Sequence, residues 1–410
     1  MPDRHVDFLL VGGGIACARC AQTLRREGAD GSILVVGREA DPPYDRPPLS
    51  KEYLAGAVGK EAARVVDDSW WEESAVELLT RTSVMKLDAG ARVAKLSTRE
   101  EVGFDKALVA TGANVRRLRA DGGDLDGIHY LRSYGNADAI RADAGPGRRA
   151  VLIGGSYIGS EVAATLTTMG VECTILMQED VCLSPQFGDE VGGFFQRLLE
   201  SHGIRAHGGD SLERYEGSGE RVERVVSQRG LELECDFVVV GAGVQPDVML
   251  ARGAGLELGE SGGIACSSRL ETSVPGIYAA GDVCEYDSPL HGRPVRIEHW
   301  DVAAEHGRTA ARNMLGADVP HEVVPYFWAE LADWAKLEYV GAGEGDRQVI
   351  RGSLEQGGEF TAFSLDGDRL VAAVTVGRPE DLMHARRWIA ERATPDPAVL
   401  ADPGSDLAAV

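Results

Sequence analysis

The stretch VDFLLVGGGIACARCAQTLRR, residues 6–26, decides the fold of this chain. Residues 6–11 are apolar apart from Asp7, which is typical of a strand buried on both faces. Three glycines follow, and the Ala-rich segment Ile15–Arg26 then reads as a helix. Ile33–Val36 is a second short apolar run. Strand, glycine turn, helix and strand in this order predict a βαβ unit.

The same order returns at residues 150–177. Ala150–Ile153 is an apolar run, Gly154–Gly159 is a glycine-rich turn, Ser160–Met169 reads as a helix, and Cys173–Met177 reads as a strand. Two βαβ openings in one chain predict an α/β protein with two Rossmann-like dinucleotide-binding domains, arranged as in the glutathione-reductase-like two-dinucleotide fold.

Beyond Gly316 the pattern changes to short alternating runs over residues 323–376, separated by turns such as Asp366-Gly367-Asp368. This pattern predicts an antiparallel sheet, and Pro379–Arg392 reads as a helix after it. We therefore expect a C-terminal α+β domain. The expected boundaries are 1–113 with 243–320 for a discontinuous domain that carries the first glycine turn, 114–242 for a domain that carries the second, 321–395 for the C-terminal domain and 396–410 for a flexible tail.

The first turn has the pattern Gly12-x-Gly14-x-x-Cys17. Gly12 permits a tight turn, and Gly14 lets the backbone approach a pyrophosphate at the helix N-terminus. Cys17 stands where Gly or Ala is usual, which adds a little bulk between helix and strand. Glu39, after the second strand, is the candidate acid for a ribose. An ordinary glycine turn of an α/β protein remains the alternative for this motif alone.

The second turn has the pattern Gly154-x-Ser156-x-x-Gly159, and Glu179 follows twenty residues later. No Arg or Lys occurs between Arg149 and Arg197. Because a 2′-phosphate needs a cation and a free ribose diol needs an acid, this favours NADH over NADPH. Two dinucleotide sites in one chain indicate hydride transfer between two dinucleotides, one of them a flavin.

The amino-acid composition argues against several classes of protein. The chain has 410 residues and a formal net charge of −23, which disfavours binding to nucleic acid and to acidic membrane surfaces. A 44% hydrophobic content rules out a largely disordered chain. No apolar run has membrane-spanning length, and we expect no signal peptide before the first strand. Seven dispersed cysteines indicate reduced thiols, so we expect a cytoplasmic protein.

Longer motifs carry a resemblance to a known family. The most specific is Pro43-Tyr44-Asp45-Arg46-Pro47-Pro48-Leu49-Ser50-Lys51. Supporting motifs are Ala110-Thr111-Gly112, Val240–Asp247, Ala279–Asp282, Arg296–Trp300 and Val324–Trp328. Over residues 6 to about 390 the chain resembles FAD-dependent NADH:ferredoxin reductases of oxygenase systems, the putidaredoxin reductase-like and biphenyl dioxygenase ferredoxin reductase-like flavoproteins, within a wider group that includes apoptosis-inducing factor.

The resemblance implies that the first motif binds FAD and the second binds NADH. It places Arg46 and Lys51 at the flavin nucleotide, and it pairs Lys51 with Glu161 near flavin N5. Val84 would contact the adenine region and Arg132 would reach FAD across the domain junction. Asp282 would bind the ribityl chain, with His299, Trp300 and Trp328 around the isoalloxazine. Further cofactor contacts are implied for motif residues Ile15, Ala16, Ala110, Thr111, Gly112, Tyr157, Ile158, Gly243, Gly281 and Glu298.

Each of these roles has a purely structural alternative. Lys51 and Glu161 could form a surface ion pair, His299 could be a core histidine and Trp328 a core aromatic, and Asp282 could belong to an ordinary turn. Two departures from the family pattern also matter. Arg38 stands where relatives commonly have an acid, which leaves Glu39 to hold the adenosine. Met177 stands where many relatives have the ribose acid, which leaves Glu179 as the substitute.

The positions of the cysteines limit the route by which electrons can leave the flavin. Residues 45–51 contain no Cys, whereas disulfide reductases, peroxidases and oxidases on this fold need one in that region. Cys17 and Cys20 form a C-x-x-C on the pyrophosphate helix, where helix packing competes with a redox or metal role. Electrons must then leave the flavin directly, which suits a [2Fe-2S] ferredoxin serving a cytochrome P450 or Rieske oxygenase. A local basic patch would dock it, with candidates Arg293, Arg296, Arg308 and Arg312.

Two other functions remain open at this stage. One is another NADH-dependent flavin oxidoreductase with a quinone or oxygen as acceptor. The other is a redox-sensing protein similar to apoptosis-inducing factor. No metal site is expected, and the expected assembly is a monomer or a weak homodimer.

Overall fold

The structure is a computed structural model that describes residues 1–343 and 345–409. It divides into two compact units, which are described separately. The first unit contains Met1–Asp45, Ala63–Asn114 and Gln245–Phe327, and the second contains Arg46–Ala62, Val115–Val244 and Trp328–Val410. The division differs from the expected domains because residues 46–62 and the C-terminal sheet belong to the same unit as the second nucleotide fold.

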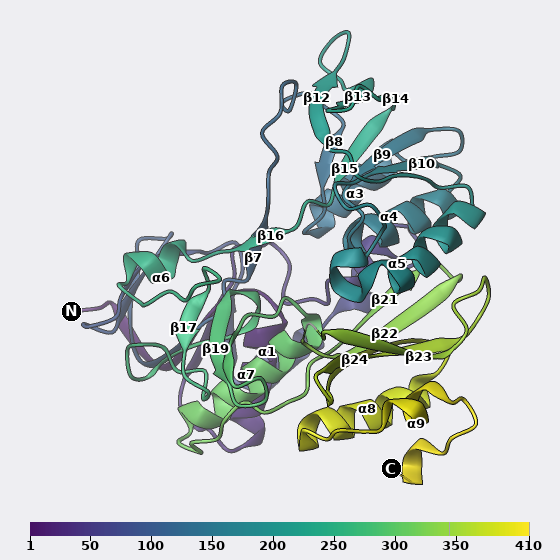
Figure 1. Cartoon of the computed structure of the whole chain (residues 1–410). Helices are drawn as coiled ribbons and strands as arrows, with labels where there is room; N and C mark the ends of the chain where they lie inside the picture. The colour runs from purple at the N-terminus through teal and green to yellow at the C-terminus, as the bar shows by residue number, and fades with distance from the viewer. Residues whose placement is uncertain (344, 410) are drawn as a thin grey trace. The chain divides into compact units, whose positions relative to one another are not determined.

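The core of the first unit is a seven-stranded sheet in the order β3-β2-β1-β6-β5-β4, with β18 paired to β6. In Figure 1 this unit is the part that carries the labels α1 (Ile15–Arg26) and α7 (Trp300–Met314). Strand β1 pairs in parallel with β2 and β6, so that Leu10 lies opposite Val35 and Leu108. The strands of this sheet are β1 (Arg4–Val11), β2 (Ile33–Val36), β3 (Val76–Leu79), β4 (Val84–Asp88), β5 (Val93–Leu96), β6 (Glu101–Val109) and β18 (Ile277–Ala279).

Helix α1 (Ile15–Arg26) packs closely against α7 (Trp300–Met314) in this unit. A Cβ at Gly307 would lie 2.2 Å from the Ala16 carbonyl oxygen, so this contact requires glycine. The predicted bounds of α1 are confirmed. The remaining elements are α2 (Asp68–Glu73), α6 (Met249–Gly253), η3 (Gly281–Val283) and a small sheet of β17 (Ile264–Cys266), β19 (Cys284–Ser288) and β20 (Arg293–Val295), with η2 (Lys60–Ala63) at a unit boundary.

The second unit has its own parallel sheet, in the order β11-β10-β9-β15-β8. Its strands are β8 (Ile128–Tyr130), β9 (Arg149–Ile153), β10 (Glu172–Leu176), β11 (Arg205–His207) and β15 (Phe237–Val240), and its helices are α3 (Tyr134–Asp143), α4 (Tyr157–Thr168) and α5 (Ser184–Ser201). Helix α4 begins at Tyr157, not at Ser160 as predicted, because extended Ser156 takes the N-cap position.

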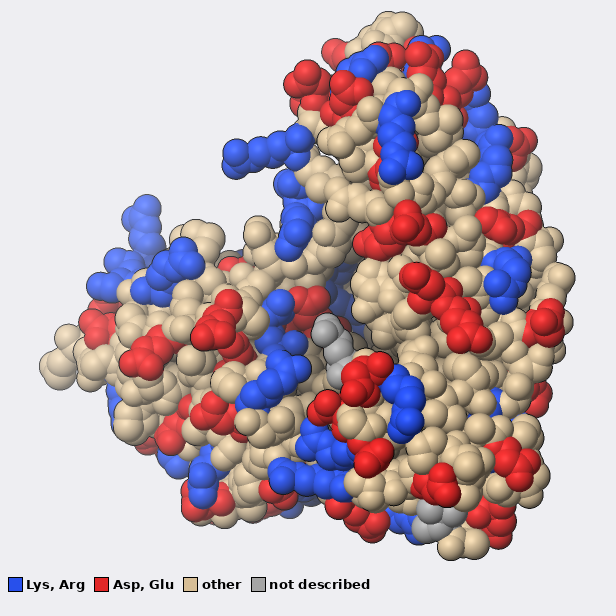
Figure 2. All heavy atoms as spheres, viewed as in Figure 1, with Lys and Arg blue, Asp and Glu red and all other residues tan. Residues whose placement is uncertain are grey.

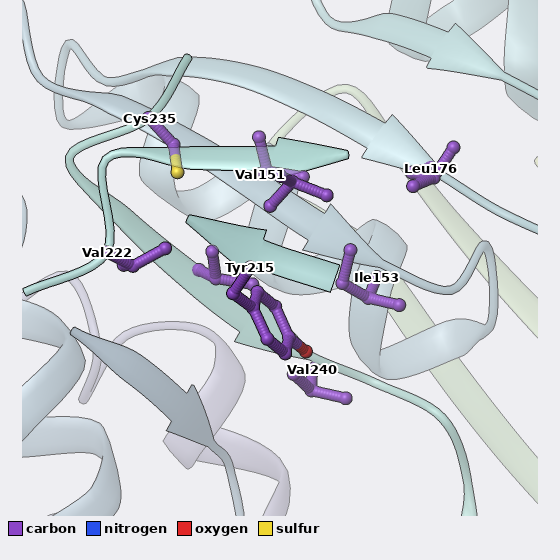
Figure 3. Packing of buried hydrophobic residues seen from close by; sticks show 9 residues of the cluster. Val151, Ile153, Leu176, Tyr215, Val222, Cys235 and Val240 are labelled. Carbon is purple, nitrogen blue, oxygen red and sulfur yellow. The ribbon is translucent and has the colours of Figure 1, made fainter. Parts of the chain in front are cut away.

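A three-stranded antiparallel sheet covers one face of this parallel sheet. Its strands are β12 (Leu212–Glu216), β13 (Arg224–Ser227) and β14 (Glu232–Glu234). Figure 3 shows the Tyr215 ring packed among Val151, Ile153 and Val240 from the sheet below it. The β-branched residues that predicted buried strands therefore meet a second apolar layer. Strands β7 (Ala113–Val115) and β16 (Val244–Pro246), at which the chain passes between the units, pair with each other.

The C-terminal part is a five-stranded sheet in the order β21-β22-β25-β24-β23 with α8 against it. Its elements are β21 (Tyr326–Leu331), β22 (Ala335–Gly341), β23 (Arg347–Gly352), β24 (Phe360–Asp366), β25 (Arg369–Val376) and α8 (Pro379–Glu391). The pairs β22–β25, β23–β24 and β24–β25 are antiparallel, as the alternating pattern predicted.

The predicted flexible tail at 396–410 differs from the structure. Residues of this segment form α9 (Pro397–Ala401) and η4 (Leu407–Ala409), and Leu400 and Leu407 are buried. The buried Arg351 guanidinium donates to the carbonyl oxygens of Asp402, Pro403 and Ser405. A Pro-, Asp- and Gly-rich composition suggested a loose end, but one long-range arginine fixes its backbone.

Two surface observations complete the fold. Among the described residues, no helix is both long enough and apolar enough to cross a bilayer. Figure 2 shows acidic and basic side chains interspersed over the visible face, in keeping with the many surface ion pairs of a chain with 42 basic and 65 acidic residues.

Candidate dinucleotide sites and a buried ion pair

The first glycine turn has the geometry of a phosphate cradle. Gly12 has φ +142°, and a Cβ there would lie 2.2 Å from the Ala110 carbonyl oxygen. A Cβ at Gly14 would meet nothing within 4 Å, so the backbone is open to a ligand at this point. Gly14 is the N-cap of α1 and no side chain caps that helix. Together these features leave backbone N–H groups for an anion.

Cys17 fills the third motif position without strain. It is fully buried, and its Sγ would lie 3.4 Å from a Cβ at Gly12, which is ordinary contact. Cys20 is also fully buried, and burial raises the pKa of both thiols well above the usual range. Both thiols therefore stay protonated at neutral pH, which favours helix packing over a redox role.

Glu39 lies three residues beyond the carboxyl end of β2, at the place expected for a ribose acid. Tyr44, itself buried, donates its hydroxyl to Glu39 Oε2 at 2.6 Å and so orients the carboxylate. Arg38 turns to other partners: its guanidinium donates to Asp247 at 3.0 Å and to Asn114 at 2.9 Å. The two neighbours therefore have different partners: Arg38 binds Asp247 and Asn114, and Glu39 binds Tyr44.

The motif Ala110-Thr111-Gly112 is tied to Asp247. The Thr111 hydroxyl donates to the Asp247 carbonyl oxygen at 2.7 Å, and the Asp247 amide donates to the Gly112 carbonyl oxygen at 2.9 Å. The sequence predicted no role for Asp247 beyond its membership of the motif Val240–Asp247. Its position at the end of that motif was the feature that could have indicated one.

Asp282 lies in η3, one turn of 3₁₀ helix directly after β18. The Gly281 amide donates to His306 Nδ1 at 3.2 Å, and the Asp282 carbonyl oxygen accepts from Arg296 at 3.1 Å. Arg296 also pairs with Glu298. These bonds hold the backbone of the turn on both sides of Asp282.

His299 and Trp300 occupy the start of α7. The His299 ring lies 4.5 Å from the Phe327 ring, and burial lowers the pKa of His299 to about 4. Trp300 Nε1 donates to Asp45 at 2.9 Å. Burial raises the pKa of Asp45, and the bond from Trp300 acts against that rise. His299 is thus neutral at pH 7, and Asp45 is a partner that sequence reasoning did not assign.

The second glycine turn is closely packed at both of its motif glycines. Gly154 has φ +107°, and a Cβ there would lie 2.6 Å from the Gly241 carbonyl oxygen. A Cβ at Gly159 would lie 2.1 Å from the Gly154 carbonyl oxygen. Ser156, in place of the usual second glycine, donates its hydroxyl to the Gly241 carbonyl oxygen at 3.2 Å. The Ser156 hydrogen bond therefore stabilises the turn, and the two glycines allow its backbone segments to pack closely.

Glu179 lies just beyond β10, where a ribose acid is expected, and it is partly exposed. However, the structure brings a cation to this turn that the local sequence lacks. A Cβ at Gly209 would lie 2.7 Å from Asp180 Oδ1 and 3.4 Å from Arg229 Nη1. A cation therefore approaches this turn from a distant part of the chain, although no Lys or Arg occurs between Arg149 and Arg197.

Lys51 and Glu161 form a buried ion pair in the second unit. Lys51 Nζ lies 2.9 Å from Glu161 Oε1, and the two side chains are 9% and 4% exposed. Pro47 and Pro48 fix the backbone of η1 (Pro47–Ser50), which presents Lys51 at its end. Glu161 lies in the part of α4 that is buried on all sides. The pair that the resemblance implied is therefore present, and a surface ion pair is excluded.

Other predicted residues are divided between the two units. Arg46 donates to the Arg132 carbonyl oxygen within the second unit. The first unit holds Gly12, Gly14, Ile15, Ala16, Glu39, Val84, Ala110, Thr111, Gly112, Gly281, Asp282, Glu298, His299 and Trp300. The second unit holds Arg46, Lys51, Arg132, Gly154, Ser156, Tyr157, Ile158, Gly159, Glu161, Glu179, Gly243 and Trp328.

The fold and the two cradles define a class. Residues 6–307 match the pyridine nucleotide-disulphide oxidoreductase family and residues 326–410 match the reductase C-terminal family. The chain belongs to the pyridine nucleotide-disulphide oxidoreductases, in the group of ferredoxin–NAD(+) reductases of oxygenase systems.

Individual relatives cover nearly the whole chain. The ferredoxin–NAD(+) reductase component of an anthranilate 1,2-dioxygenase system from Burkholderia cepacia is 37% identical over 404 residues, 97% of each chain. Putidaredoxin reductase from Pseudomonas putida is 33% identical over 97% of this chain and 94% of its own. The structure of putidaredoxin reductase in a covalent complex with putidaredoxin matches with a TM-score of 0.94 and 33% identity, over 98% and 97% of the two chains.

Proposed function

We propose that this protein is an FAD-dependent NADH:ferredoxin reductase that passes electrons from NADH to a [2Fe-2S] ferredoxin of a cytochrome P450 or Rieske oxygenase. The observation that carries the proposal is the buried Lys51–Glu161 pair on the second nucleotide-binding helix, in a chain with no cysteine at residues 45–51. Membership of the family implies FAD and NAD(H) as cofactors.

The residues of the first unit fit FAD. The open backbone at Gly14 and the uncapped N-terminus of α1 would hold its pyrophosphate. Glu39, oriented by Tyr44, would accept hydrogen bonds from a ribose diol. Asp282 would bind the ribityl chain and Val84 would contact the adenine region. Arg46 and Arg132 belong to the second unit, and their FAD contacts stay predictions from the resemblance. The isoalloxazine would accept a hydride and release electrons singly, which is the chemistry the cofactor supplies.

The second unit would bind NADH, in the proposed 114–242 domain. The N-terminus of α4, which follows the turn from Gly154 to Gly159, would bind the pyrophosphate, and Glu179 would bind the adenosine ribose. The neighbouring Arg229 places a positive charge by the same turn, which reduces the discrimination against a 2′-phosphate that Glu179 alone would give.

Lys51 and Glu161 would act at the reacting end of the coenzymes. A buried ammonium stabilises negative charge that develops beside it, because few water dipoles screen the interaction. Glu161 fixes the position of the Lys51 ammonium, with 2.9 Å between Oε1 and Nζ. Since a buried pair gains little stability over an apolar one, its presence favours a functional role.

Four arginines are the candidates for a surface that binds the ferredoxin. Arg296, Arg308 and Arg312 pair with Glu298, Glu305 and Glu27 respectively. Arg293 is exposed and has no ion pair among the described residues. We propose that an acidic ferredoxin docks on this group and exchanges partners with the three glutamates.

We also infer a cytoplasmic location and a monomer or weak homodimer. The seven cysteines are all free and buried, as expected for a protein kept in reducing conditions.

The test is NADH-driven cytochrome c reduction by the purified holoprotein with and without an added [2Fe-2S] ferredoxin. The proposal requires strong dependence on the ferredoxin. Equal turnover without any carrier would indicate a quinone- or oxygen-reducing enzyme. A long-lived reduced complex together with a change of oligomeric state would indicate a redox sensor.

A further inference from the structure

The Glu161 carboxylate is bound by three donors. Oε1 accepts from Lys51 Nζ at 2.9 Å and from the Glu330 amide at 3.1 Å. Oε2 accepts from the Ser50 hydroxyl at 2.6 Å. Ser50 and Glu161 are each 3% exposed, so water does not compete for these bonds.

The three donors of the Lys51 ammonium all have acceptors within the second unit. Besides Glu161, Nζ lies 3.2 Å from the Pro47 carbonyl oxygen and 3.5 Å from Ser50 Oγ. The bond to Ser50 is the longest of the three and lies at the limit for a hydrogen bond. It is therefore the donor that Lys51 gives up most easily to another acceptor.

Ser50 has one hydroxyl proton and two possible acceptors for it. The distance to Glu161 Oε2 is 2.6 Å, whereas that to the Pro47 carbonyl oxygen is 3.2 Å. The shorter contact, to a charged oxygen, is the stronger one. With its proton on Glu161, Ser50 turns its lone pairs to Lys51, so the hydroxyl contacts both members of the ion pair.

We infer that Ser50 is a positioning residue for the hydride transfer of the proposed function: its hydroxyl fixes the Glu161 carboxylate and so holds the Lys51 ammonium in place. This inference rests on the proposed function, because it assigns a task to Ser50 within the same site. Ser50 acts through Glu161 and Lys51 and does not itself react.

Glu161 also joins this pair to the C-terminal sheet. The Glu330 amide lies on β21, two residues beyond Trp328, which alternation places on the same face of the strand. One carboxylate thus fixes η1, α4 and the strand that carries Trp328. Its Ser50 contact is the only one of the three that a side-chain substitution can remove without taking a charge away.

A purely structural role for Ser50 would be a cross-link between η1 and α4. The chain contains such a cross-link at the same place: Thr165 Oγ1 donates to the Ser50 carbonyl oxygen at 2.8 Å, and Thr165 is 5% exposed. Thr165→Val removes a buried hydrogen bond of η1 and α4 without touching Glu161. It is therefore the matched control for Ser50→Ala.

The experiment compares Ser50→Ala, Ser50→Thr and Thr165→Val as holoproteins. Ser50→Ala should slow flavin reduction by NADH in stopped flow by roughly 10-fold or more, the effect of losing a hydrogen bond to a charged group. It should also shift the flavin midpoint potential, while the Kd for NADH stays within twofold. Ser50→Thr, which keeps the hydroxyl, should restore both. Thr165→Val should lower Tm and leave the potential unchanged.

The outcomes separate this inference from the proposed function. If the unaltered holoprotein is not reduced by NADH, the proposed function fails and the inference with it. If it is reduced but Ser50→Ala and Thr165→Val change the potential equally or not at all, Ser50 is only structural. Should Ser50→Ala not fold, Ser50→Cys, a weaker donor, must show a shift in the same direction, and its absence overturns the inference.

Discussion

The two helices that follow the glycine turns, α1 and α4, differ in what they carry. Helix α1 has no acidic residue, and it buries small side chains against α7. Helix α4 has a similar length but carries Glu161 in its buried part, paired with Lys51. The same motif therefore leads into two different helices: α1 carries no acidic residue, whereas α4 places a buried carboxylate beside Lys51.

The two turns also differ at the third motif position. A Cβ at Gly159 would lie 2.1 Å from the Gly154 carbonyl oxygen, whereas Cys17 at the equivalent place of the first turn is accommodated. The first unit has contacts of this kind at Gly12, where a Cβ would lie 2.2 Å from the Ala110 carbonyl oxygen, and at Gly307, where α7 meets Ala16. Glycine is required where two backbone segments come into contact. The motif spacing alone does not predict which positions make such a contact.

The largest expected effect breaks the second turn. Gly159→Ala should destabilise the second unit by more than ~4 kcal/mol, because a methyl group cannot fit 2.1 Å from a carbonyl oxygen. Urea denaturation and NADH binding would measure it. Cys17→Gly, which only removes a buried side chain at the equivalent position, should cost about 1–3 kcal/mol and leave FAD bound. Similar losses in the two variants would contradict this account of the turns.

The next effect concerns the charge on α4. Lys51→Ala should cost about 3–5 kcal/mol, because it leaves the buried Glu161 carboxylate without its cation. It should also slow flavin reduction in stopped flow or alter the flavin potential.

The double variant Lys51→Met with Glu161→Met sharpens this result. An apolar pair of similar volume should regain most of the stability but none of the hydride-transfer rate. If both stability and rate return, the pair has no part in the reaction.

Acid should affect the first unit through its buried histidines. Burial lowers the pKa of His321 to about 4 and that of His306 well below its ordinary value. Between about pH 6.5 and 4 the unfolded chain binds protons that the folded unit refuses, so stability is full above this window and falls by up to ~1.4 kcal/mol per pH unit and histidine. FAD release, followed by fluorescence between pH 7 and 5, reports the loss.

His321→Asn provides the control for the acid effect. The amide can keep a hydrogen bond to Thr309, which now lies 3.0 Å from His321 Nδ1, but does not titrate. The variant should release FAD at a lower pH than the unaltered protein. An unchanged pH of release would show that other groups set the acid sensitivity.

The smallest effect concerns coenzyme choice. Glu179→Ala should weaken NADH by roughly 10-fold and NADPH less, because only the free ribose diol needs the carboxylate. Arg229→Ala should weaken NADPH more than NADH, because Arg229 is the cation beside the turn. The ratio of kcat/KM for the two coenzymes measures both. Equal losses in either variant would remove that residue from coenzyme recognition.

Much of the fold followed from sequence periodicity. The buried strands at residues 6–11 and 150–153, the helix Ile15–Arg26 and the antiparallel C-terminal sheet were predicted because each depends on residues close together along the chain. The start of α4 and the order at 396–409 were not, since the first depends on Ser156 as N-cap and the second on the distant Arg351.

The site divides in the same way. Glycines, Glu39, Glu179, Lys51 and the lack of a nearby thiol could be read from motifs, because backbone conformation and residue type set these roles locally. Burial of the Lys51–Glu161 pair, its contact with Ser50, the bond from Trp300 to Asp45 and the approach of Arg229 to Gly209 required the tertiary structure. The strength of a charge or hydrogen bond depends on what surrounds it, and folding brings those surroundings from distant parts of the chain.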